Sequence, residues 1–252
     1  MQVIIAPRSP TLVSIIGLVP LALLTCAISR AEAQLAAPDG SYVRIEAGGA
    51  FHQNITFADT NPGATNCDLC GALFPSSIAG SFLVGGAFGY RIGPNVRTDL
   101  SVDYIGSATV SGHSTAATPS IGSAQLDSTV GLLNGYIDLP TANISGPIRP
   151  YIDAGIGFAH NQLGTTTGNS GAVGPFTLAG ASHTNFAWAV GAGAGYPLSP
   201  HLTLDLAYRF LNVGQIRTDS GLSLGGVSMV VTPSKTEAAG VHSVTIGLRY
   251  EF

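Results

Sequence analysis

Within the last twelve residues, Val241–Phe252, apolar side chains occupy every second position from Val244 to the end. Side chains of an extended strand alternate between its two faces. The apolar face therefore carries Val244, Ile246, Leu248, Tyr250 and Phe252. A strand of a soluble sandwich can alternate in the same way. However, Arg249 and Glu251 on the polar face and the terminal Phe252 favour a membrane barrel, in which lipid covers one face and a small polar lumen holds the charges.

The low content of charged residues supports a membrane protein. Only 10% of the residues are charged, against about 25% in an ordinary soluble domain. After residue 30 there is no run of about 20 consecutive apolar residues, so a membrane-spanning helix does not explain this composition. The net charge of −4 and the lack of a basic patch argue against a nucleic-acid partner.

The N-terminus has the pattern of a secretory signal peptide. Arg8 precedes an apolar stretch from Thr11 to Ile28, and Ala31-Glu32-Ala33 supplies a small-x-small cleavage site. We predict a cleaved signal peptide over 1–33 and a mature chain over 34–252. The alternatives are a permanent anchor and a lipoprotein acylated at Cys26.

Two cysteines remain in the mature chain. Cys67 and Cys70 form a Cys-Asp-Leu-Cys motif within a segment rich in Asn, Pro and Gly. In an exported protein this pattern predicts a local disulfide. A thioredoxin-like redox site would need a following helix, and a zinc site would need ligands beyond these two and His52. We therefore predict no metal site.

The mature chain contains eight alternating segments, joined by connections that are alternately long and short. Strands of about 9–11 residues cross a bilayer when tilted, and bacterial barrels have short periplasmic turns and long extracellular loops. The sequence therefore predicts an all-β fold, an eight-stranded antiparallel transmembrane β-barrel over 34–252. The segments are Ser41–Phe51, Gly80–Arg91, Val96–Ala108, Leu126–Leu139, Arg149–His160, Thr184–Tyr196, His201–Leu211 and Val241–Phe252.

Aromatic residues near the ends of these segments predict interfacial girdles. They are Tyr42, Phe51, Tyr90, Tyr104, Tyr151, Phe158, Phe186, Tyr196, Tyr250 and Phe252. Between the segments, polar stretches such as Gly164–Gly171 are expected to form mobile surface loops.

The polar faces predict a charged lumen. The inward charges are Arg44, Glu46, Arg91, Arg97, Asp99, Asp103, Asp138, Asp153, Asp205, Arg209, Arg249 and Glu251. The interior of an eight-stranded barrel is just wide enough for side chains to fill it, so a plug of ion pairs is expected, with a narrow gated pore as the alternative. Arg249 and Glu251 are expected to meet partners such as Glu46 and Arg44.

The histidines raise the possibility of an enzyme at the barrel rim. Predicted loop ends carry His52, His113, His160, His183 and His242, whereas His201 lies at the opposite end. No recognised nucleophile motif accompanies them. We therefore predict no catalytic residues and no cofactor.

The signal sequence, the eight alternating strands and the terminal Ile-Gly-Leu-Arg-Tyr-Glu-Phe resemble the small outer-membrane β-barrel proteins of Gram-negative bacteria, such as the OmpA-type transmembrane domain and the porin-like surface antigens of α-proteobacteria. The resemblance implies an outer-membrane location, with lipid and lipopolysaccharide as surroundings, and Tyr250 and Phe252 as part of the signal read by the barrel-assembly machinery. The expected function is envelope integrity, with passage of small solutes. The alternatives are an adhesin or host-interaction antigen and a rim-located lipid-modifying enzyme or protease.

Overall fold

The computed structural model describes residues 40–59, 74–113, 120–140, 146–171, 174–231 and 233–252. The regular elements within these ranges are all β-strands. No helix in this part of the chain is long and apolar enough to cross a membrane. The predicted signal peptide (1–33) and both Cys67 and Cys70 lie outside the described residues.

Eight long strands form a closed antiparallel ring, which confirms the predicted barrel. Each strand pairs with the next, and the last pairs with the first. The strands are β1 (Ser41–His52), β4 (Ser81–Arg91), β5 (Val96–His113), β6 (Ser120–Asp138), β7 (Arg149–Leu163), β10 (Ser182–Pro197), β11 (Leu202–Leu224) and β13 (Ser234–Glu251).

The ring closes between β13 and β1, as the terminal segment predicts. The register runs without a shift from Tyr42 opposite Glu251 to His52 opposite Val241. Closure leaves no unpaired edge within the ring, and an unpaired backbone amide or carbonyl in lipid costs several kcal/mol. This pairing therefore makes the sheet compatible with a bilayer.

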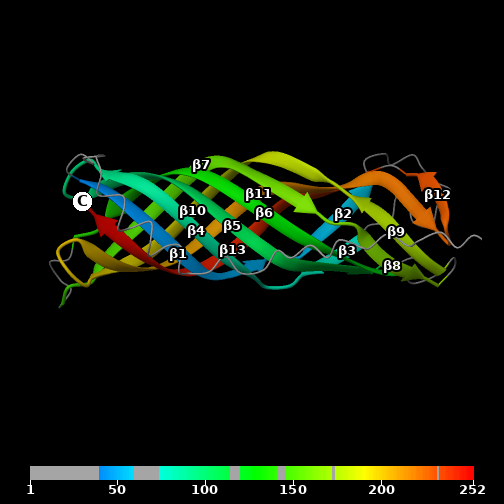
Figure 1. Cartoon of the computed structure of the whole chain (residues 1–252), viewed down its shortest axis with the longest axis horizontal. Helices are drawn as coiled ribbons and strands as arrows, with labels where there is room; N and C mark the ends of the chain where they lie inside the picture. The colour runs from blue at the N-terminus through cyan, green and yellow to red at the C-terminus, as the bar shows by residue number, and fades with distance from the viewer. Residues whose placement is uncertain (1–39, 60–73, 114–119, 141–145, 172–173, 232) are drawn as a thin grey trace, which may run out of the picture. The chain divides into compact units, whose positions relative to one another are not determined.

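Five short strands, β2 (Ile55–Asp59), β3 (Phe74–Ile78), β8 (Thr166–Ser170), β9 (Gly174–Gly180) and β12 (Val227–Val230), lie beyond the ring. The β2–β3 hairpin is paired between β13 and β5, and the β8–β9 hairpin between β6 and β11. These short strands thus continue the barrel wall beyond the ends of β1, β4, β7 and β10, at the end opposite the C-terminus (Figure 1). Much of the segment 164–171, predicted to be a mobile loop, is strand β8.

The outward face of the ring is apolar over most of its length. Leu100 is 63% exposed, Phe158 is 65% exposed and Leu206 is 58% exposed. Exposed side chains of this size, repeated on all eight strands, form the surface that lipid covers. Tyr42 and Tyr151, predicted to belong to the aromatic girdles, are instead buried inside the ring. Each lies an even number of residues from an inward charge, Arg44 or Asp153, and strand alternation therefore turns it inward.

The interior of the barrel has two sections. The charged section lies toward the periplasmic turns. The apolar section lies on the extracellular side of the inward charges on each of the seven ring strands that carry one. It consists of Ala50, Ile55, Phe57, Ile78, Leu83, Ile105, Ala108, Val110, Ala124, Leu126, Val130, Leu132, Ala159, Leu163, Ala187, Ala189, Leu211, Val213, Ile216, Ala239 and Val241.

Beside the apolar section, the outward face of the barrel changes from apolar to polar. On β6 the outward residues change from Leu133 to Thr129 and Gln125, and on β11 from Leu206 to Arg217. A β-bulge near Gly214, whose φ is 75°, accompanies the change on β11 and keeps Val213 and Ile216 inside. The extracellular part of the barrel therefore has a polar exterior and an apolar core, as in a water-soluble barrel.

Candidate functional site: the charged interior

Alternation along the strands turns every predicted lumen charge into the ring. Arg97, Asp99 and Asp103 lie on β5 in a run of four successive inward positions, the other one being Ser101. Arg209 and Asp205 come from β11 and Asp153 from β7. Nine of the charged residues are at most 8% exposed, namely Arg44, Glu46, Arg97, Asp99, Asp103, Asp153, Asp205, Arg209 and Arg249. Charges buried this deeply require partners.

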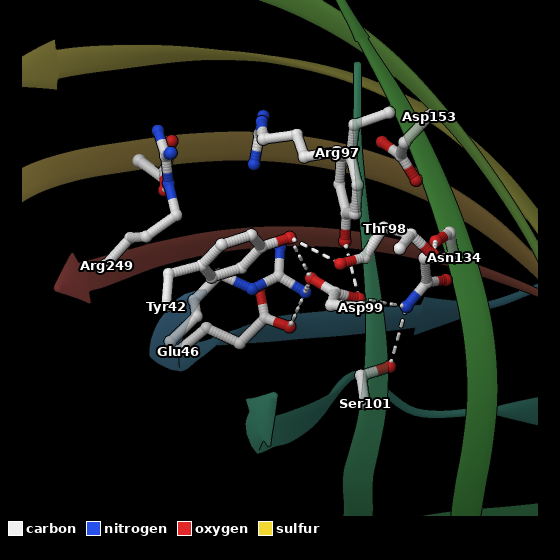
Figure 2. A network of polar contacts seen from close by, with 12 residues as sticks. Tyr42, Glu46, Arg97, Thr98, Asp99, Ser101, Asn134, Asp153 and Arg249 are labelled. Atoms are coloured by element: carbon white, nitrogen blue, oxygen red, sulfur yellow. Dashed lines mark hydrogen bonds and ion pairs between the residues drawn. The ribbon is translucent and has the colours of Figure 1, made fainter. Parts of the chain in front are cut away.

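Asp99 is the residue on which most of the buried polar contacts converge (Figure 2). The Tyr42 hydroxyl donates to Oδ2 of Asp99 at 3.1 Å, and Nη2 of Arg44 lies 3.5 Å from the same oxygen. Nδ2 of Asn134 donates to Oδ1 at 2.7 Å, and the Tyr136 hydroxyl donates to it at 3.3 Å. Donors from two strands, β1 and β6, thus surround this carboxylate on β5.

A second group of charges lies at the periplasmic mouth. Asp138 accepts hydrogen bonds from Nη1 of Arg91 at 2.9 Å and from Nε of Arg97 at 3.0 Å. Nη2 of Arg91 also donates to Glu251 at 2.9 Å. Asp138 and Glu251 therefore connect β4, β5, β6 and β13 by charge-assisted hydrogen bonds.

Arg97 lies between two tyrosine rings. Its Cζ is 4.4 Å from the centre of the Tyr136 ring and 4.6 Å from that of Tyr151. A guanidinium is attracted to an aromatic face. The Tyr151 ring also occupies space that a glycine leaves open, because a Cβ on Gly193 would come within 2.5 Å of it. The tyrosines thus belong to the site. The sequence signal that identifies them is that each lies an even number of residues from an inward charge on the same strand.

Arg249 and Glu251 have different partners from those predicted. The register places Arg249 directly opposite Arg44, and Glu46 opposite a glycine. Because like charges repel, the two arginines diverge: Nε of Arg249 donates to Asp205 at 3.0 Å, and its Nη1 donates to Glu251. The expected pairing with Glu46 and Arg44 is therefore wrong.

Arg209 links the middle of the barrel to β7 and β6. Its Nε lies 2.9 Å from Oδ2 of Asp153, and its Nη2 donates to Oδ1 of Asn134 at 2.6 Å. Asn134 also donates to Asp99. The pair Arg209–Asp153 is thus joined to the Asp99 cluster through one amide.

The described histidines are dispersed and have simple hydrogen-bond partners. His160 bonds to the Thr184 hydroxyl at 2.9 Å, His201 to the backbone carbonyl of Glu251 at 3.0 Å, and His242 to the Tyr208 hydroxyl at 2.7 Å. The side chain of His113 lies outside the described residues. Among the residues described, no group of His, Cys, Asp and Glu side chains could hold a metal ion.

A closed antiparallel ring with an apolar exterior and a charged interior defines an outer-membrane β-barrel. The comparisons with known proteins agree. A model of the outer membrane protein beta-barrel domain family matches residues 19–252, and the chain belongs to this family. It is a protein of the bacterial outer membrane, where it is surrounded by lipid and lipopolysaccharide.

The relatives come from several Gram-negative bacteria. The chain is 30% identical over 207 residues to uncharacterized proteins of Brucella abortus, Brucella suis and Brucella melitensis, covering 70% of each chain. It is 32% identical over 128 residues to the outer membrane protein PagN of Salmonella typhimurium, covering 51% of each. The structure of the outer membrane protease OmpT from Escherichia coli is similar in fold, with a TM-score of 0.50, 11% identity and coverage of 87% and 99%.

The buried pair Arg209–Asp153 provides a test of the charged interior. Arg209→Met and Asp153→Asn should each lower the free energy of unfolding by about 3 kcal/mol, because each leaves a buried partner without its counter-charge. The double variant should lose less than the sum of the two, by roughly 0.5–3 kcal/mol. Urea unfolding in detergent micelles measures both. Arg149→Met, at an exposed arginine, is the control. A loss for Arg149→Met equal to that for Arg209→Met would contradict the account.

Proposed function

We propose that the protein is a closed structural barrel that contributes to envelope integrity and does not conduct solutes. The observation that supports this proposal is the apolar section. It fills the extracellular half of the interior with side chains that are all at most 8% exposed. The section also contains a few buried polar side chains, such as Ser128 and Asn161, but they are hydrogen-bonded to each other at 2.7 Å. An ion entering this section would therefore lose its hydration and gain few polar ligands, which is costly. The porin-like alternative requires a continuous polar path, and the described interior favours a plug.

The charged section adds a second barrier on the periplasmic side. Salt bridges join Arg91, Asp138, Glu251 and Arg249 across the mouth. A solute would have to displace these pairs before it reached the apolar section. Two barriers in series favour a sealed barrel over a gated pore.

The exposed aromatic pair at the C-terminus supports a contact with the barrel-assembly machinery. Tyr250 is 45% exposed and Phe252 is 50% exposed, and their ring centres are 5.4 Å apart.

We also propose two features on residues outside the described ranges: a signal peptide over 1–33 and a disulfide between Cys67 and Cys70. We propose no enzymatic activity. The hydrogen-bond partners of His160, His201 and His242 support this, since none of them is a carboxylate.

Conductance measurements test the closed barrel. The refolded protein in a planar bilayer should show no single-channel events over long recordings. Exchanging two interior leucines, in Leu132→Ser/Leu211→Ser, should introduce openings because it brings hydroxyls and space into the apolar section. The outward pair Leu133→Ser/Leu206→Ser is the matched control and should stay silent. Frequent openings of the unaltered protein would contradict the proposal.

Recognition of host or cell-surface ligands is a second candidate, favoured by the β11–β12 hairpin. Its turn, Gly225-Gly226, has φ values of 55° and 88°, as a two-residue type I′ turn requires. Val227 is 63% exposed, Met229 42% and Val230 85%. Apolar side chains that are displayed in this way on the extracellular side mark a contact surface.

Adhesion assays test the hairpin. Cells that display Val227→Ser/Val230→Ser should bind epithelial cells several-fold less than cells that display the unaltered protein, because the variant loses apolar contact area. Ser223→Ala/Ser228→Ala in the same hairpin is the control and should bind normally. Equal binding by all three proteins would exclude the hairpin as the contact.

A further inference from the structure

The two groups of lumen charges differ in their balance. At the mouth, three arginines (Arg91, Arg97, Arg249) are joined to three carboxylates (Asp138, Asp205, Glu251). In the middle of the barrel there are only two arginines, Arg44 and Arg209, and four carboxyl groups, Glu46, Asp99, Asp103 and Asp153. The middle group therefore has two more acids than bases.

This surplus is enclosed on both sides. The mouth group lies toward the periplasm, and the apolar section lies toward the extracellular side. The four carboxyl residues are at most 8% exposed. An uncompensated carboxylate in such surroundings is so costly that the group becomes neutral instead.

Two of the four carboxyl groups each have an arginine nitrogen at 3.5 Å or closer. Asp99 receives hydrogen bonds from Tyr42 and Asn134, besides its ion pair with Arg44. Asp153 lies 2.9 Å from Nε of Arg209. These two are the carboxylates that balance the two arginines.

Glu46 and Asp103 are the remaining pair. Glu46 has Arg44 at 3.6 Å, shared with Asp99, and the Thr245 hydroxyl at 3.1 Å. Asp103 is 1% exposed and makes no ion pair among the described side chains. Its Oδ2 accepts a weak bond from Ser101 at 3.4 Å, and its Oδ1 is buried without a donor.

The strand register brings these two carboxyl groups together. Gly85 on β4 lies directly between them, opposite Glu46 on one side and opposite Asp103 on the other. A Cβ on Gly85 would come within 1.9 Å of Oδ1 of Asp103, so the aspartate side chain extends over the glycine. The two carboxyl groups are thus close enough to interact. Two carboxyl groups can form a hydrogen bond only if one of them carries a proton.

We propose that Glu46 and Asp103 form a buried proton-binding site, in which the two carboxyl groups share one proton at neutral pH. The proton is taken from water as the barrel folds and lies between an oxygen of Asp103 and an oxygen of Glu46. No other bond changes. The pair then carries one negative charge, which Arg44 faces, and the orphaned Oδ1 of Asp103 gains a partner.

The site makes stability depend on pH in a defined direction. In the unfolded chain both carboxyl groups are ionised at neutral pH, since free carboxyl groups titrate near pH 4. The folded barrel therefore binds one proton more than the unfolded chain, and its free energy of unfolding falls as the pH rises. The charged and titratable groups that face the pair are Arg44, Arg209, Asp99 and Asp153.

Infrared spectroscopy and amide variants test the proposal. The unaltered protein in lipid at about pH 7 should show the C=O stretching band of a buried protonated carboxyl group, and Asp103→Asn should remove it. Asparagine resembles the neutral acid in shape and charge, so Asp103→Asn should change the unfolding equilibrium at pH 7 by less than roughly tenfold. It should also flatten the dependence of stability on pH between about 5 and 7, where the unfolded chain has lost the proton that the folded pair holds.

Asp99→Asn is the matched control on the same strand. It removes a true carboxylate from Arg44 and should shift the equilibrium toward unfolding by roughly 100-fold or more. Absence of the carboxyl band in the unaltered protein would overturn the proposal, even if a variant failed to fold. A loss of stability for Asp103→Asn as large as for Asp99→Asn would also overturn it. So would a stability that depends on the sodium concentration and not on pH, since a bound cation would then take the place of the proton.

Discussion

Pairing of β13 with β1 is the interaction on which the rest of the structure depends. Without it the sheet would have two open edges in hydrocarbon, where each unsatisfied backbone group costs several kcal/mol. Once the ring is closed, each strand has an outside and an inside, and alternation sends Ile45 to the lipid and Arg44 to the lumen. Closure also confines the charges within reach of one another. The ion pairs of the interior are therefore a consequence of the same backbone hydrogen bonds that make the chain a membrane protein.

The second principle of the structure is the reversal of polarity along the strands. Within the bilayer the barrel has apolar side chains outside and charges inside, whereas beyond the lipid-facing band Leu126 and Val213 turn inward and Gln125 and Arg217 face outward. Each half of the barrel suits the medium around it, because lipid requires an apolar exterior and water requires an apolar core. The same reversal places the apolar section above the charged section and presents the β11–β12 hairpin outside the membrane. The proposed sealed interior and the proposed contact surface thus have one origin.

Much of this arrangement could be predicted from the sequence, because a period of two residues determines which face a side chain occupies. The eight strands, their order, the closure and the outward band were all accessible in this way. The extracellular extensions were not. Ser120–Gln125 and Thr166–Ser170 consist mostly of short or polar side chains without a clear apolar-polar alternation, and so they resemble a loop. Ion-pair partners were not accessible either. The two-residue period of the strand shows only that Arg249 points inward. The register between β13 and β1 places it opposite Arg44, and its side chain therefore turns to Asp205.

The most direct test of the account follows one strand through the reversal. Spin labels placed one at a time on β11, in a background without cysteines, report contact with lipid through oxygen and contact with water through a nickel chelate. Outward positions should respond to oxygen from Leu204 to Tyr208 and to the chelate at Arg217 and Asp219, while inward positions from Asp205 to Ile216 should respond weakly to both. Lipid contact that continues to Asp219, or chelate contact at Leu211 and Val213, would contradict the reversal and the sealed interior.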